Sequence, residues 1–295
     1  MTILCGSFGV GDTGLQGEFC KGIRRGVVDG INVIELSLPY SNHDGLLKRS
    51  VTFLRFAFRT VKIALQGRYD LVYATSTPLT VAIPAIAVRL LRGTPYIFEV
   101  RDLWPELPKA MGVVKNPIVL KLLDVLESLA YRYASACVGL SPGIVEGILQ
   151  KQPNMQCELI PNGCDTELFG VSPVDVQTVS EILNEPFDPS YFHFIFAGTH
   201  GAANGLDAIL YAAATLKAKG CNHIRINLVG EGKHKSELME MSKDLGVVDI
   251  VRFYPAKPKK QLSALFTAMD AGLMVLKNVP AFYFGTSPNK FFDYI

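Results

Sequence analysis

Short apolar runs alternate with segments of helical periodicity along the whole chain, and this alternation restricts the fold more than any other feature. The runs are rich in Val, Ile, Phe and Tyr and mostly lack a strict apolar–polar alternation, which is typical of parallel strands buried on both faces. The pattern therefore predicts an α/β fold with doubly wound sheets. The expected strands are residues 2–5, 31–36, 71–74, 96–100, 136–139, 158–160, 192–197, 224–229, 250–254 and 271–275. The expected helices include residues 79–91, 117–133, 206–219, 233–245 and 259–269.

The strand–helix pattern restarts near the middle of the chain. Residues 172–191 are polar and contain proline, so we expect a linker there between two tandem Rossmann-like domains, residues 1–171 and 192–295. Ligands of open α/β sheets bind at the carboxyl ends of the strands. The chain opens directly on a strand and stops within an apolar helical turn, so we expect a fragment whose two domains lack their outermost elements.

Composition excludes several classes of protein. Apolar residues make up 49% of the chain and charged residues 19%, which is enough for a large core and argues against disorder. A net charge of +2 does not favour nucleic-acid binding. No run reaches the roughly 20 apolar residues that span a bilayer. The six cysteines lack the spacing of a metal site and are interpreted as reduced thiols of a cytoplasmic protein.

The tail SPNKFFDYI has the residues of an anion site at the start of a helix. Ser287 is expected to cap the helix, with Pro288 in its first position. Asn289 and Lys290 would then present backbone N–H groups and a cation to a diphosphate. Asp293 would lie on nearly the same face and accept hydrogen bonds from ribose hydroxyls. The alternative is an ordinary capped helix with a solvated lysine–aspartate pair.

Two glycine-rich turns follow expected strands of the second half. In FAGTHGAANGLDAIL, Gly198 allows a close backbone approach to a phosphate or sugar, and His200 and Asn204 are candidate donor contacts. In LVGEGKHKSEL, Gly230 precedes Glu231, which is a candidate contact for a base or ribose. A tight strand-to-helix turn explains the glycines equally well.

Charged residues crowd the segment IFEVRDLWPELP directly after an expected buried strand. Asp102 is a candidate base or acceptor-orienting group, and Arg101 is expected to pair with it or to reach a phosphate. Glu99, Trp104 and Glu106 are candidates for the acceptor side. A purely structural cluster of charges is the competing interpretation.

Residues 46–65 form a basic amphipathic pattern. Lys48, Arg55, Arg59 and Lys62 fall on one stripe of a helical wheel, and apolar residues occupy a broad opposing arc. Such a helix can lie on an anionic membrane surface. The alternative is a core helix with a solvated basic face, which we favour because the first domain needs a helix here.

Six segments taken in order resemble family-4 retaining glycosyltransferases with the GT-B fold. They are GTPYIFEVRDLWPE, LIPNGCDTELF, FAGTHGAANGLDAIL, LVGEG, VRFYP and SPNKFFDYI. The nearest likeness is the subgroup that builds lipopolysaccharide O-antigen or capsule sugars. The resemblance implies a nucleotide-sugar donor, with UDP the expected nucleotide, and a lipid-linked or polysaccharide-precursor acceptor. It also implies retention of configuration, a hexosyl or N-acetylhexosaminyl group and, since no DxD-type site is found, no metal or other cofactor.

The resemblance also assigns roles to residues, all numbered as in this chain. The donor diphosphate and ribose are assigned to Asn289, Lys290 and Asp293, further phosphate contacts to Gly198, Thr199 and Asn204, and the base to the segment ending at Lys257. The pair Arg101 and Asp102 corresponds to the position near the transferred sugar. Many members carry Arg and Lys where Thr199 and Asn204 stand here, and Gly285 replaces a glutamate, so Lys290 is expected to supply phosphate charge instead.

The sequence leaves two other functions open. One is a GT-B-fold sugar-nucleotide epimerase, which would react with the donor alone. The other is a non-catalytic sugar-nucleotide-binding subunit, which would bind without transfer. The expected location is the cytoplasm, with residues 46–65 in peripheral contact with the inner face of the plasma membrane. Whether the fragment is active by itself stays open as well.

Overall fold

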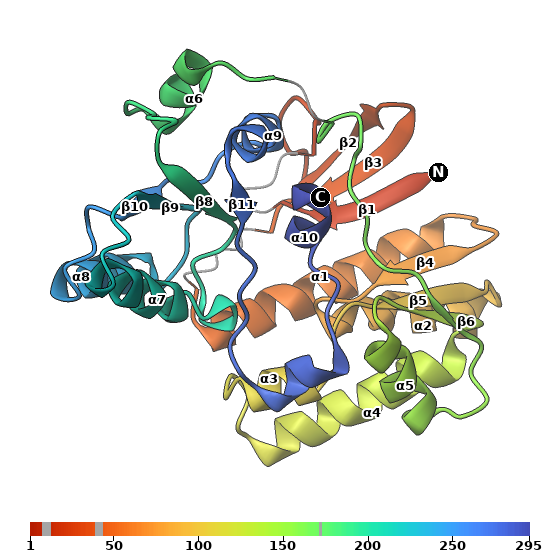
Figure 1. Ribbon diagram of the computed structural model, residues 1–295. Coiled ribbons are helices and arrows are strands. Elements are labelled where there is room, and N and C mark those ends of the chain that lie inside the picture. The colour runs from red at the N-terminus through yellow and green to blue at the C-terminus, as the bar shows by residue number, and fades with distance from the viewer. Residues whose placement is uncertain (8–12, 39–43, 171–172) are drawn as a thin grey trace. The chain divides into compact units, whose positions relative to one another are not determined.

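The computed structural model describes residues 1–7, 13–38, 44–170 and 173–295 (Figure 1). The chain divides into two compact units. Unit 1 comprises Met1–Pro161 and Tyr283–Thr286, and unit 2 comprises Asn162–Phe282 and Ser287–Ile295. The division falls at Pro161, ahead of the linker expected at residues 172–191. Much of that expected linker is helix α6 (Val176–Leu183), which Asp175 caps through its side chain.

Unit 1 contains a four-stranded parallel sheet in the order β4-β5-β6-β7. Its strands are β4 (Val72–Thr75), β5 (Tyr96–Val100), β6 (Ala136–Gly139) and β7 (Cys157–Leu159). The helices are α2 (Ala82–Arg92), which follows the short 3₁₀ turn Leu79–Val81, then α3 (Glu106–Ala110), α4 (Pro117–Tyr133) and α5 (Pro142–Lys151). The core of this part contains Tyr96 and Phe98 of β5, Tyr131 of α4, and Ile144 and Ile148 of α5.

A second, three-stranded sheet in unit 1 has the order β1-β3-β2. β1 (Thr2–Gly6) pairs in parallel with β3 (Ile31–Leu36), whereas β2 (Ile23–Val28) pairs with β3 in antiparallel fashion. Helix α1 (Leu46–Gln66) packs its residue Ile63 against this sheet. The sequence IRRGVV of β2 has two arginines and a glycine, so apolar patterning did not predict this strand.

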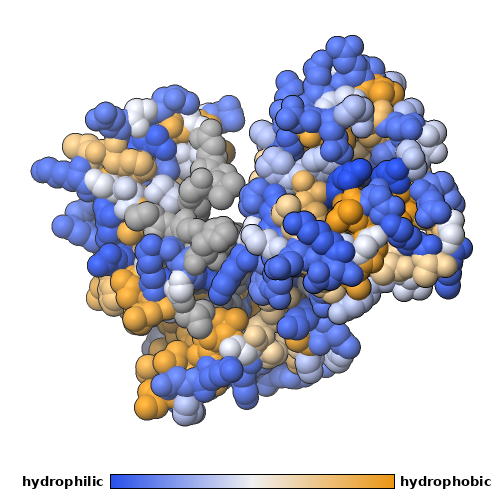
Figure 2. All heavy atoms as spheres, turned by 90° about the vertical axis from the view of Figure 1, so that its left-hand side faces the viewer, coloured by the Kyte–Doolittle hydropathy of each residue, from blue (hydrophilic) through white to orange (hydrophobic). Residues whose placement is uncertain are grey.

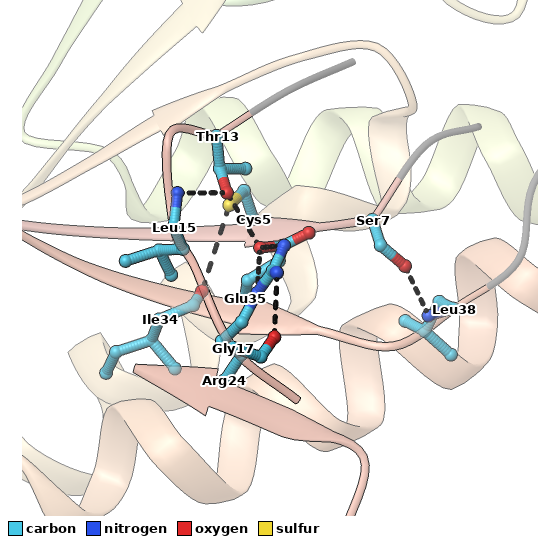
Figure 3. Close-up of polar contacts among 9 residues, drawn as sticks. All are labelled: Cys5, Ser7, Thr13, Leu15, Gly17, Arg24, Ile34, Glu35 and Leu38. Atoms are coloured by element: carbon cyan, nitrogen blue, oxygen red, sulfur yellow. Dashed lines mark hydrogen bonds and ion pairs between the residues drawn. The ribbon is translucent and has the colours of Figure 1, made fainter. Parts of the chain in front are cut away.

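A partly buried ion pair links the second sheet to the segment that precedes β2 (Figure 3). Arg24 donates two hydrogen bonds to Glu35, from Nε at 3.0 Å and from Nη2 at 2.7 Å. The hydroxyl of Thr13 donates to the same carboxylate at 2.7 Å. Arg24 also donates to the backbone carbonyl of Gly17 at 3.0 Å. Glu35 is 3% exposed, and these charge-assisted bonds offset the cost of burying it.

Unit 2 is a parallel four-stranded sheet in the order β10-β9-β8-β11. Its strands are β8 (Phe192–Ala197), β9 (Ile224–Val229), β10 (Val251–Tyr254) and β11 (Ala271–Gly272). The helices are α6, α7 (Asp207–Ala218), α8 (Lys235–Asp244), α9 (Lys259–Ala268) and α10 (Asn289–Tyr294), with a 3₁₀ turn at Ala202–Asn204. A further 3₁₀ turn, Pro280–Phe284, begins in unit 2 and ends in the segment of unit 1 that starts at Tyr283. Two apolar clusters form its core, one with Phe196 and Leu228 and the other with Ile195 and Leu265.

The α/β class with parallel sheets is as the sequence predicts. None of the helices in the described parts of the chain is both long enough and apolar enough to cross a membrane.

Gly143 in the first turn of α5 leaves room for the segment Tyr283–Thr286. A Cβ atom on Gly143 would lie 1.9 Å from the carbonyl oxygen of Phe284. Ser141, which caps α5 by accepting a hydrogen bond from the N–H of Ile144, donates from its hydroxyl to the same carbonyl at 3.1 Å. This segment therefore reaches α5 only because residue 143 has no side chain.

We expect Gly143→Ala to destabilise the protein by about 1–3 kcal/mol, because the backbone of Phe284 has to move away. Denaturant unfolding measures this difference. Gly163→Ala is the matched control, because a Cβ atom at Gly163 would meet no atom within 4 Å. Equal stability of the two variants would contradict this packing.

Candidate functional site

The turns that follow β8 and β9 in unit 2 touch each other through their backbones. Gly230 has a φ of 151°, and a Cβ atom there would lie 1.9 Å from the carbonyl oxygen of Gly198. The N–H of His200 donates to the carbonyl of Glu231 at 2.9 Å, and the N–H of His234 donates to the carbonyl of His200 at 3.0 Å. The two glycine-rich turns predicted from the sequence are thus one structure at the carboxyl ends of neighbouring strands.

Lys290 of α10 lies against this structure. Its Nζ atom donates to Oδ1 of Asn204 at 3.0 Å and lies 4.1 Å from the centroid of the Phe196 ring. Asn204 in turn donates from Nδ2 to the carbonyl of Thr199 at 2.7 Å. The structure thus brings four predicted donor-site residues together, namely Gly198, Thr199, Asn204 and Lys290.

No carboxylate pairs with Lys290 among the residues that the structure describes. Burial lowers the pKa of its ammonium group to about 8, because a charge removed from water is disfavoured. The face of the Phe196 ring and the amide oxygen of Asn204 act in the opposite direction, since both attract a cation. Lys290 is therefore a largely buried cation whose charge is incompletely balanced.

Helix α10 is held to the end of the sheet by its tyrosine. The hydroxyl of Tyr294 accepts a hydrogen bond from the N–H of Ala197 at 3.0 Å and donates to the carbonyl of Leu273 at 3.3 Å. The ring occupies the space where a side chain on Gly272 would lie. This contact fixes the position from which Lys290 extends.

The start of α10 differs from the prediction. The helix begins at Asn289 with Pro288 as the N-cap residue, and no side chain caps it. The hydroxyl of Ser287 accepts instead from the N–H of Asn162 at 2.8 Å, a residue 125 positions earlier. Asn289 is exposed at the start of the helix. A long-range contact has replaced the predicted local cap.

The other predicted donor residues are less closely engaged. Asp293 is half-buried and makes no ion pair with Lys290 within the described part of the chain, contrary to the alternative of a lysine–aspartate pair. Burial raises the pKa of its carboxyl group, and Lys259 partly offsets this rise. Glu231 is exposed and pairs with Lys235 at 2.8 Å. Lys257 is half-buried in the segment after β10.

Sequence reasoning missed the role of Lys235. Its Nζ atom donates to the carbonyls of Gly230 and Tyr254, each at 2.9 Å, as well as to the carboxylate of Glu231. It therefore ties together the carboxyl ends of β9 and β10. Its place in the first turn of a helix after a glycine-rich turn was the available signal.

His200, a predicted donor contact, is buried beneath the turns. The side chain is 0% exposed, and neither ring nitrogen has a hydrogen-bond partner among the described residues. The rings of Phe196 and Phe253 lie about it, with centroids at 6.2 and 6.0 Å. Burial, with a further contribution from Lys235, lowers the pKa of the imidazole to about 4, so the ring is neutral at pH 7. His200 thus packs in the interior beneath the two turns and does not face solvent.

A second group of predicted residues lies at the carboxyl ends of β4 and β5 in unit 1. Glu99, 9% exposed, accepts from the hydroxyl of Tyr73 at 2.7 Å and from Arg101 at 2.9 Å. Asp102 accepts from the hydroxyl of Thr77 at 3.2 Å. Arg101 therefore pairs with Glu99 rather than with Asp102. Burial raises the pKa of Asp102, and Thr77 and Arg101 partly offset this rise.

Trp104 and Glu106 are engaged within unit 1. Trp104 packs against the core, with its Nε1 atom buried. Glu106 pairs at 3.1 Å with Lys151, which also contacts Asp124 at 3.3 Å and the buried Glu127. For Glu106 the geometry favours the structural alternative, because its carboxylate belongs to a charge cluster that joins α3, α4 and α5.

Several solved structures share the fold of this chain. Anabaena Alr3699/HepE, solved in complex with UDP and glucose, is 19% identical and matches 84% of this chain and 61% of its own, with a TM-score of 0.60. Sucrose-phosphate synthase from Thermosynechococcus elongatus is 15% identical (86% and 61%, TM-score 0.65). An α,α-trehalose-phosphate synthase (UDP-forming) from Burkholderia xenovorans is 12% identical (92% and 71%, TM-score 0.67). The fold is that of the GT-B glycosyltransferases.

Sequence comparison then assigns the family. The model of the glycosyl transferase 4-like domain matches residues 9–163, more than half of the chain, and the chain belongs to this family. The probable glycosyltransferase WbjE of Pseudomonas aeruginosa is 28% identical over 185 residues, which are 61% of this chain and 45% of WbjE. The chain thus spans less than half the length of this curated relative.

The pKa of Lys290 makes stability depend on pH in alkaline solution. Between about pH 8 and the ordinary value of 10.5, the unfolded chain binds a proton that the native chain does not. The free energy of unfolding therefore rises with pH across this window, by up to roughly 3 kcal/mol. We expect the rise to disappear in Lys290→Met, as measured by denaturant unfolding at several pH values. Lys243→Met, at an exposed position of α8, should keep it.

His200 predicts a separate dependence in acid. Between pH 6.5 and about 4 the unfolded chain gains a proton while the buried imidazole stays neutral, so the free energy of unfolding falls as the pH falls. The expected loss is roughly 3 kcal/mol. Comparison of the protein with His200→Phe isolates this contribution, and His223→Gln at an exposed position is the control. An identical acid dependence in the protein and in His200→Phe would contradict it.

Proposed function

We propose that the protein transfers a sugar from a UDP-sugar to a glycan acceptor, and that the turns after β8 and β9 bind the donor. The observation that carries the proposal is Lys290, a largely buried cation without a carboxylate partner in the described structure. It lies at the carboxyl end of a parallel sheet, where α/β folds bind their ligands. A diphosphate at this point would supply the missing negative charge.

The donor is expected to contact several groups at once. Lys290 and the exposed Asn289 face the diphosphate, and the backbone of Gly198 and Thr199 approaches it closely. Asn204 orients Lys290, because its amide oxygen accepts from Nζ while its amide nitrogen is held by Thr199. Asp293 is assigned to the ribose, and Glu231 and Lys257 to the ribose or base. A departing diphosphate gains negative charge, so a preorganised cation lowers the barrier to transfer.

The nucleotide is proposed from the relatives. Alr3699/HepE was solved with UDP, and the trehalose-phosphate synthase is described as UDP-forming. Both share the fold, and family membership supports the same class of reaction here. Transfer of a hexosyl or N-acetylhexosaminyl group with retention of configuration and without a metal belongs to the same proposal.

The acceptor is proposed to react in unit 1. Asp102 is the candidate to orient or deprotonate an acceptor hydroxyl, because burial raises its pKa toward the range that suits a general base. Arg101 is held by Glu99 and is the candidate cation beside it. We propose a lipid-linked precursor of a cell-surface glycan as the acceptor, with the enzyme at the cytoplasmic face of the membrane.

The donor site is tested by thermal unfolding with UDP, GDP, ADP or NAD. A ligand at 100 times its Kd adds about 2.7 kcal/mol of stability, which is a readily measured rise in Tm. We expect a rise with UDP, and a smaller rise or none in Lys290→Met, which lacks the cation but keeps the length of the side chain. A titration at pH 7 and pH 9 should also show weaker binding at pH 9, where free Lys290 is mostly neutral.

Lys243→Met is the matched control, since it removes an equal charge from an exposed position of unit 2. It should keep the full rise in Tm. A rise with UDP that is equal in the protein and in Lys290→Met would place the nucleotide elsewhere. No rise with any of the four nucleotides would contradict a donor site in this chain.

A further inference from the structure

Helix α1 has a buried face that accounts for only part of its apolar residues. Ala57 and Ile63 are 0% and 7% exposed, and Ile63 packs against the core of the three-stranded sheet with Leu36 and Leu38. Thr60 on the same side is also buried. This face attaches the helix to unit 1, as the interpretation as a core helix requires.

A second apolar stripe runs along α1 on the outside. Leu47, Val51, Leu54 and Phe58 follow one another at the i, i+4, i+7 and i+11 positions of one helix face, and their exposed fractions are 81%, 39%, 43% and 65%. This outer stripe is turned away from the buried face and packs in no core cluster. Contiguous exposed apolar groups of this kind mark interaction surfaces.

Exposed cations border the outer stripe along one side. Arg55 and Lys62 are exposed and have no ion-pair partner among the described residues, while Lys48 is exposed and pairs with Asp44 at 2.7 Å. Arg59 differs from the prediction, because it donates to the carbonyl of Gly22 at 2.9 Å and so belongs to the attachment of the helix. The helix therefore has a buried face, an apolar face and a cationic flank.

The start of the outer stripe borders a hollow of about 310 Å³. The hollow is lined by Leu38, Leu47, Val51, Lys48, Thr52 and Arg55, so its wall is apolar with cations at the edge. Figure 2 shows hydrophobic residues gathered in the lower left part of the surface among hydrophilic ones.

We propose that the outer stripe of α1 docks onto an anionic lipid bilayer, with the helix lying in the plane of the membrane surface. An apolar stripe parallel to the helix axis, flanked by Lys and Arg, matches the layered chemistry of a lipid interface. In a bilayer the acyl chains lie beneath a plane of phosphates. The apolar side chains of the stripe would enter the acyl layer, and the flanking cations would contact the phosphates of the headgroups. The stripe spans about 16 Å at 1.5 Å per residue, which allows shallow insertion and no crossing.

This inference stands independently of the proposed sugar transfer, because it rests on residues of α1 alone and needs no donor. It commits to a lipid surface rather than to a protein partner on account of the charge. A second copy of the chain would bring the same cations face to face, at a cost in repulsion.

The test is co-sedimentation of the protein with vesicles of phosphatidylcholine, alone or mixed with phosphatidylglycerol. We expect binding to the mixed vesicles, weaker binding at high salt, and little binding to phosphatidylcholine alone. Leu54→Ser combined with Phe58→Ser should weaken binding about tenfold or more, because two apolar groups no longer enter the bilayer. Arg55→Gln combined with Lys62→Gln should weaken it about fivefold for each cation removed.

Two controls match these variants. Leu122→Ser removes an exposed apolar side chain from α4, and Lys219→Gln with Lys243→Gln removes two exposed cations from unit 2. Both should bind as the unaltered protein does. Far-ultraviolet circular dichroism checks that every variant is folded.

Unchanged binding of the α1 variants, or an equal loss in the controls, would overturn the proposal. A different occupant of the stripe would also be visible. If sedimentation shows a dimer that Phe58→Ser converts to a monomer without loss of vesicle binding, then the stripe is an interface between copies of the chain.

Discussion

The backbone contact between the turns after β8 and β9 is the constraint on which the rest of the proposed donor site depends. Gly230 can approach the carbonyl of Gly198 only because it has no side chain, and its φ of 151° lies in a region that glycine favours. Because the turns are in contact, they bury the side chain of His200. At the end of β8, the N–H of Ala197 donates a hydrogen bond to the hydroxyl of Tyr294. The position of Lys290 follows from that anchor. A larger residue at 230 would therefore disturb the sheet end, the buried imidazole and the cation together.

Two partly buried lysines differ in whether nearby carboxylates balance their charge. Lys151 of unit 1 is surrounded by three carboxylates; burial alone would lower its pKa, but its bonds to Glu127 and Glu106 more than reverse that effect and raise it. Lys290 of unit 2 has an amide oxygen and an aromatic face instead, and burial lowers its pKa. The charge of Lys151 is balanced by carboxylates of the same unit, and these ion pairs hold α3, α4 and α5 together. Lys290 has no carboxylate partner in the described chain, so the anion proposed to bind there would stabilise its charge.

Most of the fold could be predicted from the sequence because the strands are continuous apolar runs. The predictions failed where a contact between residues distant in the sequence determines the local structure. The bounds of β5, β8 and β9 match the prediction to the residue. Strand β2 was missed because Arg24 of this strand pairs with the buried carboxylate of Glu35 on β3, and no local pattern reveals that contact. The predicted cap at Ser287 was wrong because Asn162 engages its hydroxyl. Likewise Arg59 looked like part of a solvated stripe, although it is bound to the carbonyl of Gly22. Partners distant in sequence are invisible to periodicity.

The two hydrogen bonds of the Asn204 amide limit which residues can replace it. Asn204 presents its oxygen to Lys290 and its nitrogen to the carbonyl of Thr199, so both ends of the amide are used. Aspartate has the same shape, and a single base substitution converts an asparagine codon into an aspartate codon. Such a change would place a permanent counter-ion beside Lys290 and put a carboxylate oxygen against the carbonyl of Thr199. If Lys290 binds a diphosphate as proposed, the new carboxylate would compete with that ligand for the ammonium group.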